Sequence, residues 1–168
     1  MLFDMTVTPF IKSLTNLNHI LDKAQAHADA KKFDSQVLAT TRLFPDMLNL
    51  TRQVQIACDS AKLCAARLSG KEAPVNDDSE TTLADLKTRI NQTISYLRDF
   101  TAQDFNGAET KHITQPRWEG KYLTGTEYAL EHAIPNVYFH VSTTYAILRS
   151  NGVEIGKKDY LGEMPYKK

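Results

Sequence analysis

The sequence predicts an all-α protein, an up-down four-helix bundle with a long, partly β-hairpin crossover between its third and fourth helices. Three observations support this fold. Four stretches repeat apolar residues at helical spacing, residues 101–125 lack that repeat, and the fourth stretch is apolar on two sides. Helices with such apolar faces are stable when neighbours cover those faces. The length of 168 residues suits one domain, residues 1–168.

The first helix is expected over residues 9–31. Thr8 can cap it, and Pro9 suits its first position, because an amide hydrogen is not needed there. One face of this stretch is apolar: Phe10, Leu14, Leu17, Leu21, Ala24 and Ala28. We expect this face to pack in the core of the bundle.

The second helix is expected over residues 35–69, with Gly70 ending it. Its apolar face carries Leu38, Leu43, Met47, Leu50, Val54, Ala57, Ala61 and Leu68. Pro45 interrupts the pattern near its start, because proline removes a backbone donor. Since Phe44 would be a poor N-cap, the sequence favours one kinked helix over two separate helices.

The third helix is expected over residues 81–100, after a polar connection at residues 70–80. Thr82 and Asp85 have the spacing of a capping box, with Asp in place of Glu. The apolar face of this helix carries Leu83, Leu86, Ile90, Ile94 and Leu97. These residues should face the first two helices.

The crossover, residues 101–125, is rich in Gly, Thr and polar residues. The alternation in K-H-I-T-Q-P-R-W-E-G-K-Y-L-T favours two short strands around Pro116. Trp118 and Tyr122 are expected to anchor this segment to the bundle. Long connections are usually functional or ordered against something, so the crossover is a candidate for either role.

The fourth helix is expected from about Glu127 to the C-cap signal Asn151-Gly152. Its main apolar face carries Leu130, Ile134, Val137, Val141, Tyr145 and Leu148. Its back carries Tyr128, Phe139 and Ala146. A helix that is apolar on two sides should be buried on two sides. Pro135 lies inside the pattern and frees the carbonyl of Glu131, so we expect a bend there.

Composition excludes several classes of protein. Lys+Arg and Asp+Glu both number 20, so no basic surplus points to a nucleic-acid partner. No apolar run approaches the roughly 18 residues of a membrane span, and the first ten residues lack the basic region of a signal peptide. Cys58 and Cys64 are too far apart on one helix to pair, which favours free thiols in the cytoplasm.

The histidines of the fourth helix are the first candidates for chemistry. His132, Asn136 and His140 follow one another at spacings of four residues. His132 and His140 differ by about 12 Å in helical rise, so one metal ion does not easily take both. His132 is also expected to point away from the main apolar face. His140, at the edge of that face, is expected to be a hydrogen-bonded structural residue, with substrate binding, proton transfer or metal binding as alternatives.

The second helix offers polar residues that could meet His140. Arg42, Asp46 and Gln53 lie on one side of its apolar face, either as a solvated flank or as a buried polar cluster. Proline bends in both helices at similar depth would leave a small cavity between Asp46 and Gln53 on one side and Asn136 and His140 on the other. We therefore expect His140 to point into the bundle and to hydrogen-bond a group on the second helix, directly or through one water.

Four blocks of the chain resemble the family catalogued as "domain of unknown function 1993": L-F-P-D-M (43–47), Q-V-Q-I-A-C-D-S-A-K (53–62), P-N-V-Y-F-H (135–140) and Y-A-I-L-R-S-N-G-V (145–153). The resemblance runs over nearly the whole chain. It implies a DinB-like (YfiT-like) four-helix bundle, a fold whose members are often metal-dependent hydrolases or thiol transferases and often dimers.

The broader DinB-like set typically presents three histidines, one on the second helix and two on the fourth as H-x-x-x-H. Here the second helix has no histidine, and His140 alone can match on the fourth, with Asn136 four residues earlier and Thr144 four later. Asn and Gln are weak ligands for zinc or nickel. We therefore expect no metal or other cofactor, with a divalent metal kept as an alternative.

Three functions from different classes fit these observations. The favoured one is a non-catalytic or small-ligand-binding bundle that keeps a polar pocket at His140, Asn136, Asp46, Gln53 and Arg42. The second is a hydrolase or transferase that uses His140, oriented by Asp46, with or without a divalent metal. The third is an interaction protein whose dimer surface is its working part. The apolar back of the fourth helix favours a homodimer under all three.

Overall fold

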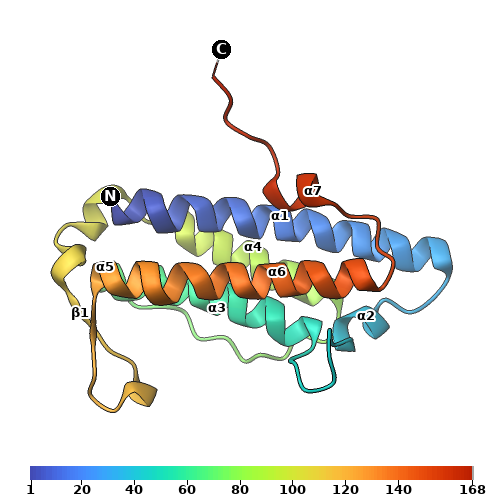
Figure 1. The fold of residues 1–168 in the computed structure, drawn as a ribbon, viewed down its shortest axis with the longest axis horizontal. Coiled ribbons are helices and arrows are strands. Elements are labelled where there is room, and N and C mark those ends of the chain that lie inside the picture. The colour runs from blue at the N-terminus through green and yellow to red at the C-terminus, as the bar shows by residue number, and fades with distance from the viewer. Residues whose placement is uncertain (168) are drawn as a thin grey trace.

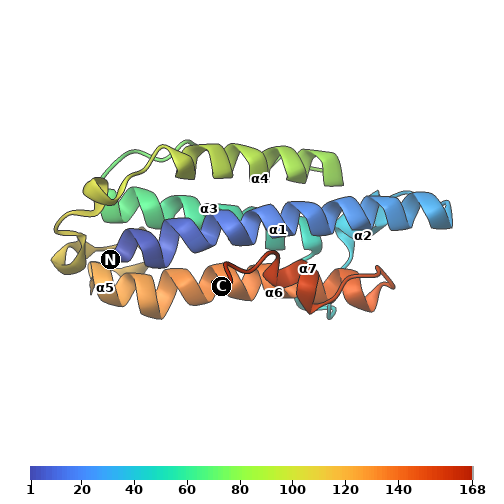
Figure 2. The same ribbon diagram turned by 90° about the horizontal axis from the view of Figure 1, so that it is seen from above.

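In the computed structural model, which describes residues 1–167, four long helices lie side by side in a bundle (Figure 1). They are α1 (Leu2–Lys31), α3 (Leu50–Ser69), α4 (Leu83–Arg98) and α6 (Ile134–Ser150). Seen from above, α4 and α6 form the two sides, with α1 and α3 between them (Figure 2). Two short helices are α2 (Gln36–Thr40), next to α3, and α7 (Lys157–Leu161), which packs on α1. The predicted all-α bundle is confirmed.

One continuous core joins the apolar faces of the four helices. Its fully buried members include Phe10, Leu14, Leu50, Leu86, Ile90, Val137 and Leu148. Cys58 and Cys64 lie in this core as free thiols, as predicted, and burial raises the pKa of each to about 12. Both thiols are therefore protonated at neutral pH. In the described part of the chain, no helix has the length and apolar character needed to cross a membrane.

α1 begins seven residues before the predicted start. It opens at Leu2 and carries Pro9 in its interior, where proline leaves one backbone carbonyl without its helical donor. The extra turns continue the apolar face of the helix, because Leu2 and Val7 are fully buried there. Phe3 also packs edge-on against Phe105 of the crossover, with ring centroids 5.6 Å apart. Burial of these side chains offsets the lost hydrogen bond, and the predicted start at Pro9 is wrong.

The predicted second helix is two helices, α2 and α3, separated by residues 41–49. Asn49 caps α3, and its side chain accepts a hydrogen bond of 3.0 Å from the Arg52 amide. The backbone of Asn49 also forms an isolated antiparallel bridge with Arg42, which closes the intervening loop. Pro45 and Leu43 therefore lie exposed in a loop rather than on a kinked helix. The prediction failed because it weighed Phe44 as an N-cap and overlooked Asn49.

α3 and α4 run in the same direction, so the bundle does not alternate at this step. Residues 70–82 return along the whole of α3: Lys62 Nζ donates to the Pro74 carbonyl at 2.8 Å, and Arg52 Nη1 contacts Asp78 Oδ2 at 2.7 Å. An extended chain covers about 3.3 Å per residue against about 1.5 Å in a helix, so this connection is long enough to return along α3. The predicted capping box of Thr82 is present at the start of α4.

A buried arginine holds this return connection in place. The Arg89 side chain of α4 is 1% exposed, and its Nη1 lies 2.9 Å from both Asp78 Oδ1 and Glu80 Oε1. Its Nη2 lies 3.0 Å from Asp59 Oδ1 on α3. Burial opposes ionisation of Glu80, but hydrogen bonds from Arg89 and Gln55 outweigh it and lower the pKa of that carboxyl. One guanidinium thus links α3, α4 and the connection between them.

The crossover between α4 and α6 contains the predicted hairpin. Strand β1 (His112–Ile113) pairs antiparallel with β2 (Leu123–Thr124) around Pro116. Trp118 packs against Tyr128 with ring centroids 6.2 Å apart, as an anchor should. Tyr122 is 54% exposed and stacks on His112 instead, so its predicted contact with the bundle is wrong. The two strands place the segment between them beside the beginning of the fourth helix.

Replacing Arg89 with alanine should lower the free energy of unfolding by about 2 kcal/mol or more, because it removes a buried side chain and its three charge-assisted contacts with partly exposed carboxylates. Urea denaturation at pH 7, followed by circular dichroism, measures the change. Arg98→Ala removes an exposed arginine from the same helix and is the matched control, for which a change below about 0.5 kcal/mol is expected. Equal effects of the two substitutions would contradict the role given to Arg89.

Candidate functional site

A π-helical turn, Tyr128–Ala133, precedes α6 and follows the short α5 (Gly125–Glu127). Such a turn holds an extra residue, which rotates the preceding side chains by about 100° relative to an α-helix. Tyr128 is therefore 1% exposed and packs in the core, whereas Leu130, which was predicted on the main apolar face, is 43% exposed. Pro135 is the second residue of α6, where its missing donor is tolerated. The irregularity expected around Pro135 takes the form of this π turn.

Gly125 fixes where the fourth helix begins. A Cβ atom at this position would lie 1.8 Å from the carbonyl oxygen of Ala108 and 3.1 Å from the Leu68 side chain. Only glycine allows the crossover to approach the helix this closely. Thr124 caps the helix from the preceding strand, and its side chain and that of Glu127 bond reciprocally to backbone amides. The crossover and the π turn are therefore held against each other.

His140 points into the bundle, as predicted. Its Nδ1 lies 2.7 Å from Oε1 of Gln53 on α3. The amide oxygen accepts, so Nδ1 donates and carries the proton of the neutral ring. The amide nitrogen of Gln53 donates in turn to the Leu48 carbonyl at 3.1 Å. This chain of bonds ties α6 to the loop before α3, and burial lowers the pKa of His140.

The structure separates the other three predicted pocket residues from this pair. Asn136 donates to the Ser60 hydroxyl at 2.7 Å, further along α3 than Gln53. Arg42 and Asp46 lie exposed in the loop of residues 41–49, where Arg42 bonds the Met47 carbonyl. The prediction placed them beside Gln53 because it assumed one continuous helix. Because that helix is interrupted, Arg42 and Asp46 no longer lie on the same helix face as Gln53. Gln53, rather than Asp46, is therefore the residue that contacts His140.

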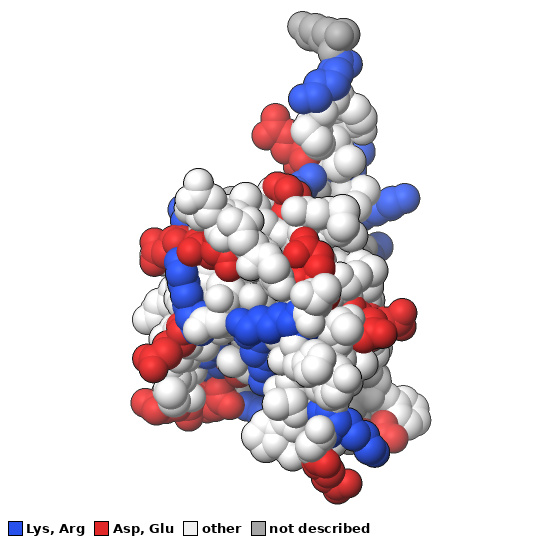
Figure 3. All heavy atoms as spheres, turned by 90° about the vertical axis from the view of Figure 1, so that its left-hand side faces the viewer, with Lys and Arg blue, Asp and Glu red and all other residues white. Residues whose placement is uncertain are grey.

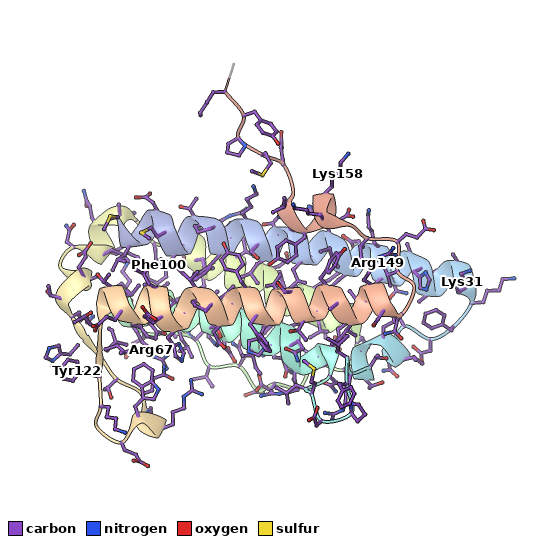
Figure 4. The ribbon with its side chains drawn as sticks, in the orientation of Figure 1. Lys31, Arg67, Phe100, Tyr122, Arg149 and Lys158 are labelled. Atoms are coloured by element: carbon purple, nitrogen blue, oxygen red, sulfur yellow. The ribbon has the colours of Figure 1, made fainter. Side chains whose placement is uncertain are left out.

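A cavity of about 340 Å³ lies between α3, the π turn with the start of α6, and crossover residues 115–117. It is lined by Ile56, Asp59, Ser60, Leu63, Arg67, Gln115, Pro116, Arg117, Tyr128, His132, Ala133 and Asn136. Figure 4 shows Arg67 on the side of the bundle where the crossover hairpin projects. Of the predicted pocket residues, only Asn136 lines this cavity. The volume is at the lower end of the range for small-molecule sites.

His132, which the sequence placed away from the apolar face, forms part of the cavity wall. Its ring stacks on Tyr128 at 5.4 Å and meets Trp118 edge-on at 5.4 Å. Its Nε2 lies 3.0 Å from Nη2 of Arg117. A guanidinium can only donate, so Nε2 accepts and the ring proton lies on Nδ1. Burial lowers the pKa of His132, and the positive charges of Arg117 and Arg67 lower it further.

Two donors of the cavity wall are buried without a partner among residues 1–167. They are the amide nitrogen of Gln115, whose residue is 9% exposed, and Nδ1 of His132. Buried donors in native proteins are nearly always satisfied by protein, water or a ligand. This arrangement could not be predicted from the helical repeat, because a π turn changes the spacing at which residues share a face, and His132 turns toward the cavity there.

Arg67 reaches the cavity from the last turn of α3. Its Nη1 donates to the Tyr128 hydroxyl at 2.9 Å. Asp59 supplies the single carboxylate among the lining residues, and it is already paired with Lys62 at 2.9 Å and with Arg89 at 3.0 Å. The wall therefore carries a surplus of positive charge. It also has more hydrogen-bond donors than the acceptors around them can satisfy. Figure 3 shows the end of the bundle nearest the hairpin, where basic and acidic side chains intermix.

The residues at His140 do not fit a three-histidine metal centre. Among residues 1–167, no three His, Cys, Asp or Glu side chains converge as metal ligands would. His140 has an amide oxygen as its neighbour on α3, and its Nδ1 is engaged in that bond. Amide oxygens are weak ligands for zinc and nickel. We therefore assign no chemistry to a metal at this position.

The bundle, with its return connection and its hairpin crossover, belongs to the DinB-like class of four-helix proteins. A crystal structure of a DinB family member protein from Shewanella denitrificans is 60% identical in sequence and superimposes with a TM-score of 0.97, covering 100% of this chain and 96% of that one. The family model "Domain of unknown function (DUF1993)" matches residues 2–161, so the chain belongs to that family. The resemblance seen in the four sequence blocks is thus confirmed. No curated protein matches the chain.

The free energy of unfolding should fall as the pH drops below about 6.5. The pKa values of His132 and His140 are both lowered in the folded protein, so the unfolded chain, with histidine pKa values near 6.5, takes up protons first. The stability they contribute is present above pH 6.5 and is lost towards the lower folded pKa values. His140→Gln should make the loss between pH 7.5 and pH 5 shallower.

Urea denaturation at several pH values between 7.5 and 5 measures this dependence. His19→Gln, at an exposed position of α1, is the matched control and should leave the slope unchanged. A slope that is the same in His140→Gln and in the unmodified protein would show that burial of His140 does not contribute.

Proposed function

We propose that this protein binds a small polar molecule in the cavity between α3, the π turn and residues 115–117. The observation that carries the proposal is a cavity of about 340 Å³, two of whose lining residues, Gln115 and His132, each hold a buried donor without a partner among residues 1–167. A bound molecule with acceptor atoms, reached by small side-chain rotations, would satisfy donors that the fold itself leaves open. The polar pocket predicted for this protein is therefore assigned to this cavity rather than to His140.

The composition of the cavity wall supports this proposal. Ile56, Leu63 and Pro116 supply apolar surface, and the polar groups approach from α3, the crossover and the fourth helix. Small-molecule sites commonly combine an apolar wall with a few converging polar groups that fix orientation. The crossover supplies part of the wall, which agrees with the tendency of long connections to be functional.

A non-catalytic role is favoured over a hydrolase or thiol transferase for three reasons. His140, which would be the catalytic residue of the alternative hydrolase or transferase, uses Nδ1 to hold Gln53. The Ser60 hydroxyl at the cavity accepts a hydrogen bond from Asn136, so no base activates it through that bond. Burial holds the pKa values of Cys58 and Cys64 near 12, so neither forms a thiolate nucleophile at neutral pH. The free thiols also agree with a cytoplasmic location.

Leu63→Trp tests the binding function. Leu63 lines the cavity and is partly exposed, so an indole at this position should fill the space without disrupting the core. A library of small neutral, cationic and anionic metabolites is screened with the full chain by thermal shift and ligand-observed NMR. We expect at least one compound to raise the melting temperature of the unmodified protein, and Leu63→Trp to abolish that shift.

Val37→Trp is the matched control, because it places the same side chain at an exposed position of α2 far along the chain from the cavity. It should retain binding. Failure of every compound to bind, or binding that Leu63→Trp leaves intact, would contradict a ligand site in this cavity.

We also propose a homodimer formed through the outer side of α6. Phe139 lies there with 55% of its surface exposed. Leu130 of the π turn is 43% exposed, while Tyr128, also predicted for the back of the helix, is buried in the chain itself. Exposed aromatic side chains on a long helix favour self-association, and two-fold dimers are the commonest form.

Phe139→Glu should convert the dimer into a monomer, because it would bury two unpaired carboxylates in a two-fold interface. Sedimentation velocity at micromolar concentration measures the change. Val75→Glu, at a 90% exposed position of the return connection, is the control and should remain dimeric. A monomeric unmodified protein would contradict the proposal.

A further inference from the structure

Arg67 and Arg117, the two arginines that line the cavity, share one property that sets them apart from the arginines of the Arg89 cluster. Each has a neutral partner: Arg67 donates to the Tyr128 hydroxyl at 2.9 Å, and Arg117 contacts the His132 ring at 3.0 Å. Within residues 1–167, neither guanidinium makes an ion pair. Each guanidinium has five N–H donors, so most of them remain free for another group.

The two arginines come from segments that are far apart in the sequence. Arg67 lies in the last turn of α3, and Arg117 lies in the crossover hairpin, yet both line the same cavity. The carboxylate of Asp59 is the one negative charge on the wall, and Lys62 and Arg89 already pair with it. The two guanidinium charges are therefore not neutralised by the protein.

We propose that the ligand of this cavity is a small organic oxyanion, bound through a carboxylate or phosphate group between Arg67 and Arg117. This inference rests on the proposed ligand-binding function and names the chemical class of the ligand. Guanidinium groups match both oxyanions with paired N–H donors, and such charge-assisted bonds are about twice as strong as neutral ones. Small side-chain rotations would let the partnerless donors of Gln115 and His132 add hydrogen bonds to the same group.

The remaining wall limits the rest of the ligand. Ile56, Leu63 and Pro116 face it with apolar surface, and a cavity of about 340 Å³ holds a small metabolite but not a dinucleotide. His132 is backed by Tyr128 and Trp118, which fix the orientation of its ring. The ligand would thus place its anionic group at the arginines and a short neutral part against the apolar wall.

Isothermal titration of the full chain with inorganic phosphate, succinate and neutral succinamide tests the inference. We expect one or both anions to bind saturably and at least tenfold more tightly than succinamide. Their affinity should fall as the NaCl concentration is raised. Binding of phosphate alone or of succinate alone would identify which oxyanion the site takes. Affinities for both anions that equal the affinity for succinamide would overturn the inference.

Arg117→Gln and Arg67→Gln should each lower the affinity for the anion at least tenfold. Arg98→Gln makes the same change of charge at an exposed position of α4 and should leave the affinity within about twofold. Arg117 is exposed and bonds only His132 among residues 1–167, so its substitution is not expected to unfold the protein even if loss of the Arg67–Tyr128 bond does. Equal weakening by Arg98→Gln would attribute binding to net charge and overturn the inference.

The same titrations separate this inference from the proposed function. If neutral compounds bind and Leu63→Trp blocks them, while phosphate and succinate do not bind, the cavity is a ligand site but not an oxyanion site. If no compound of any charge binds, both proposals are overturned. If anions bind and Leu63→Trp together with Arg117→Gln removes that binding, both proposals hold.

Discussion

The π-helical turn at Tyr128–Ala133 determines which side chains of the fourth helix reach α3. One extra residue in this turn brings Tyr128 into the core and rotates His132 onto the wall of the cavity, while Leu130 turns outward. A regular helix would have reversed those positions, and the cavity would have lost both its aromatic wall and its histidine. The contact of Arg67 with the Tyr128 hydroxyl depends on the same rotation. The candidate site is thus a consequence of one local departure from α-helical geometry.

Two neighbouring features keep that departure in place. Gly125 lets the crossover approach within a distance at which any side chain would collide with the Ala108 carbonyl. Pro135 follows the turn at the second position of α6, where a proline costs little stability. In a continuous α-helix, the carbonyl of Glu131 would have lost the hydrogen bond that Pro135 cannot donate. The crossover then brings Gln115 and Arg117 to the opened face. The site therefore consists of three segments, namely α3, the π turn and residues 115–117, and their mutual contacts hold them in position.

The helical repeat was sufficient to predict the four-helix bundle, the stripes of α1 and α4, and the hairpin, because burial of one face imposes a period that side chains must follow. The same reasoning predicted the contact of His140 with α3, since residues near the main face point inward wherever the helix is regular. It failed at residues 41–49, where Asn49 supplies a better cap than Phe44, and at residues 128–133, where a π turn changes the period. The direction of α4 also escaped prediction, because the composition of residues 70–82 does not reveal where an extended segment leads.

The two polar pairs between α3 and α6 have different consequences for function. At His140, the polar groups between the two helices have partners: Nδ1 donates to Gln53, and Gln53 donates to the Leu48 carbonyl, so the pair holds the loop before α3 against α6. Further along α3, Asn136 and Ser60 satisfy each other, but Gln115, His132 and two guanidiniums around them keep unused donors. A satisfied network stabilises a fold, whereas a wall with surplus donors and uncompensated positive charge favours an acceptor from outside. The pair at His140 is therefore structural, and the ligand site that we propose lies at the arginines beside the π turn.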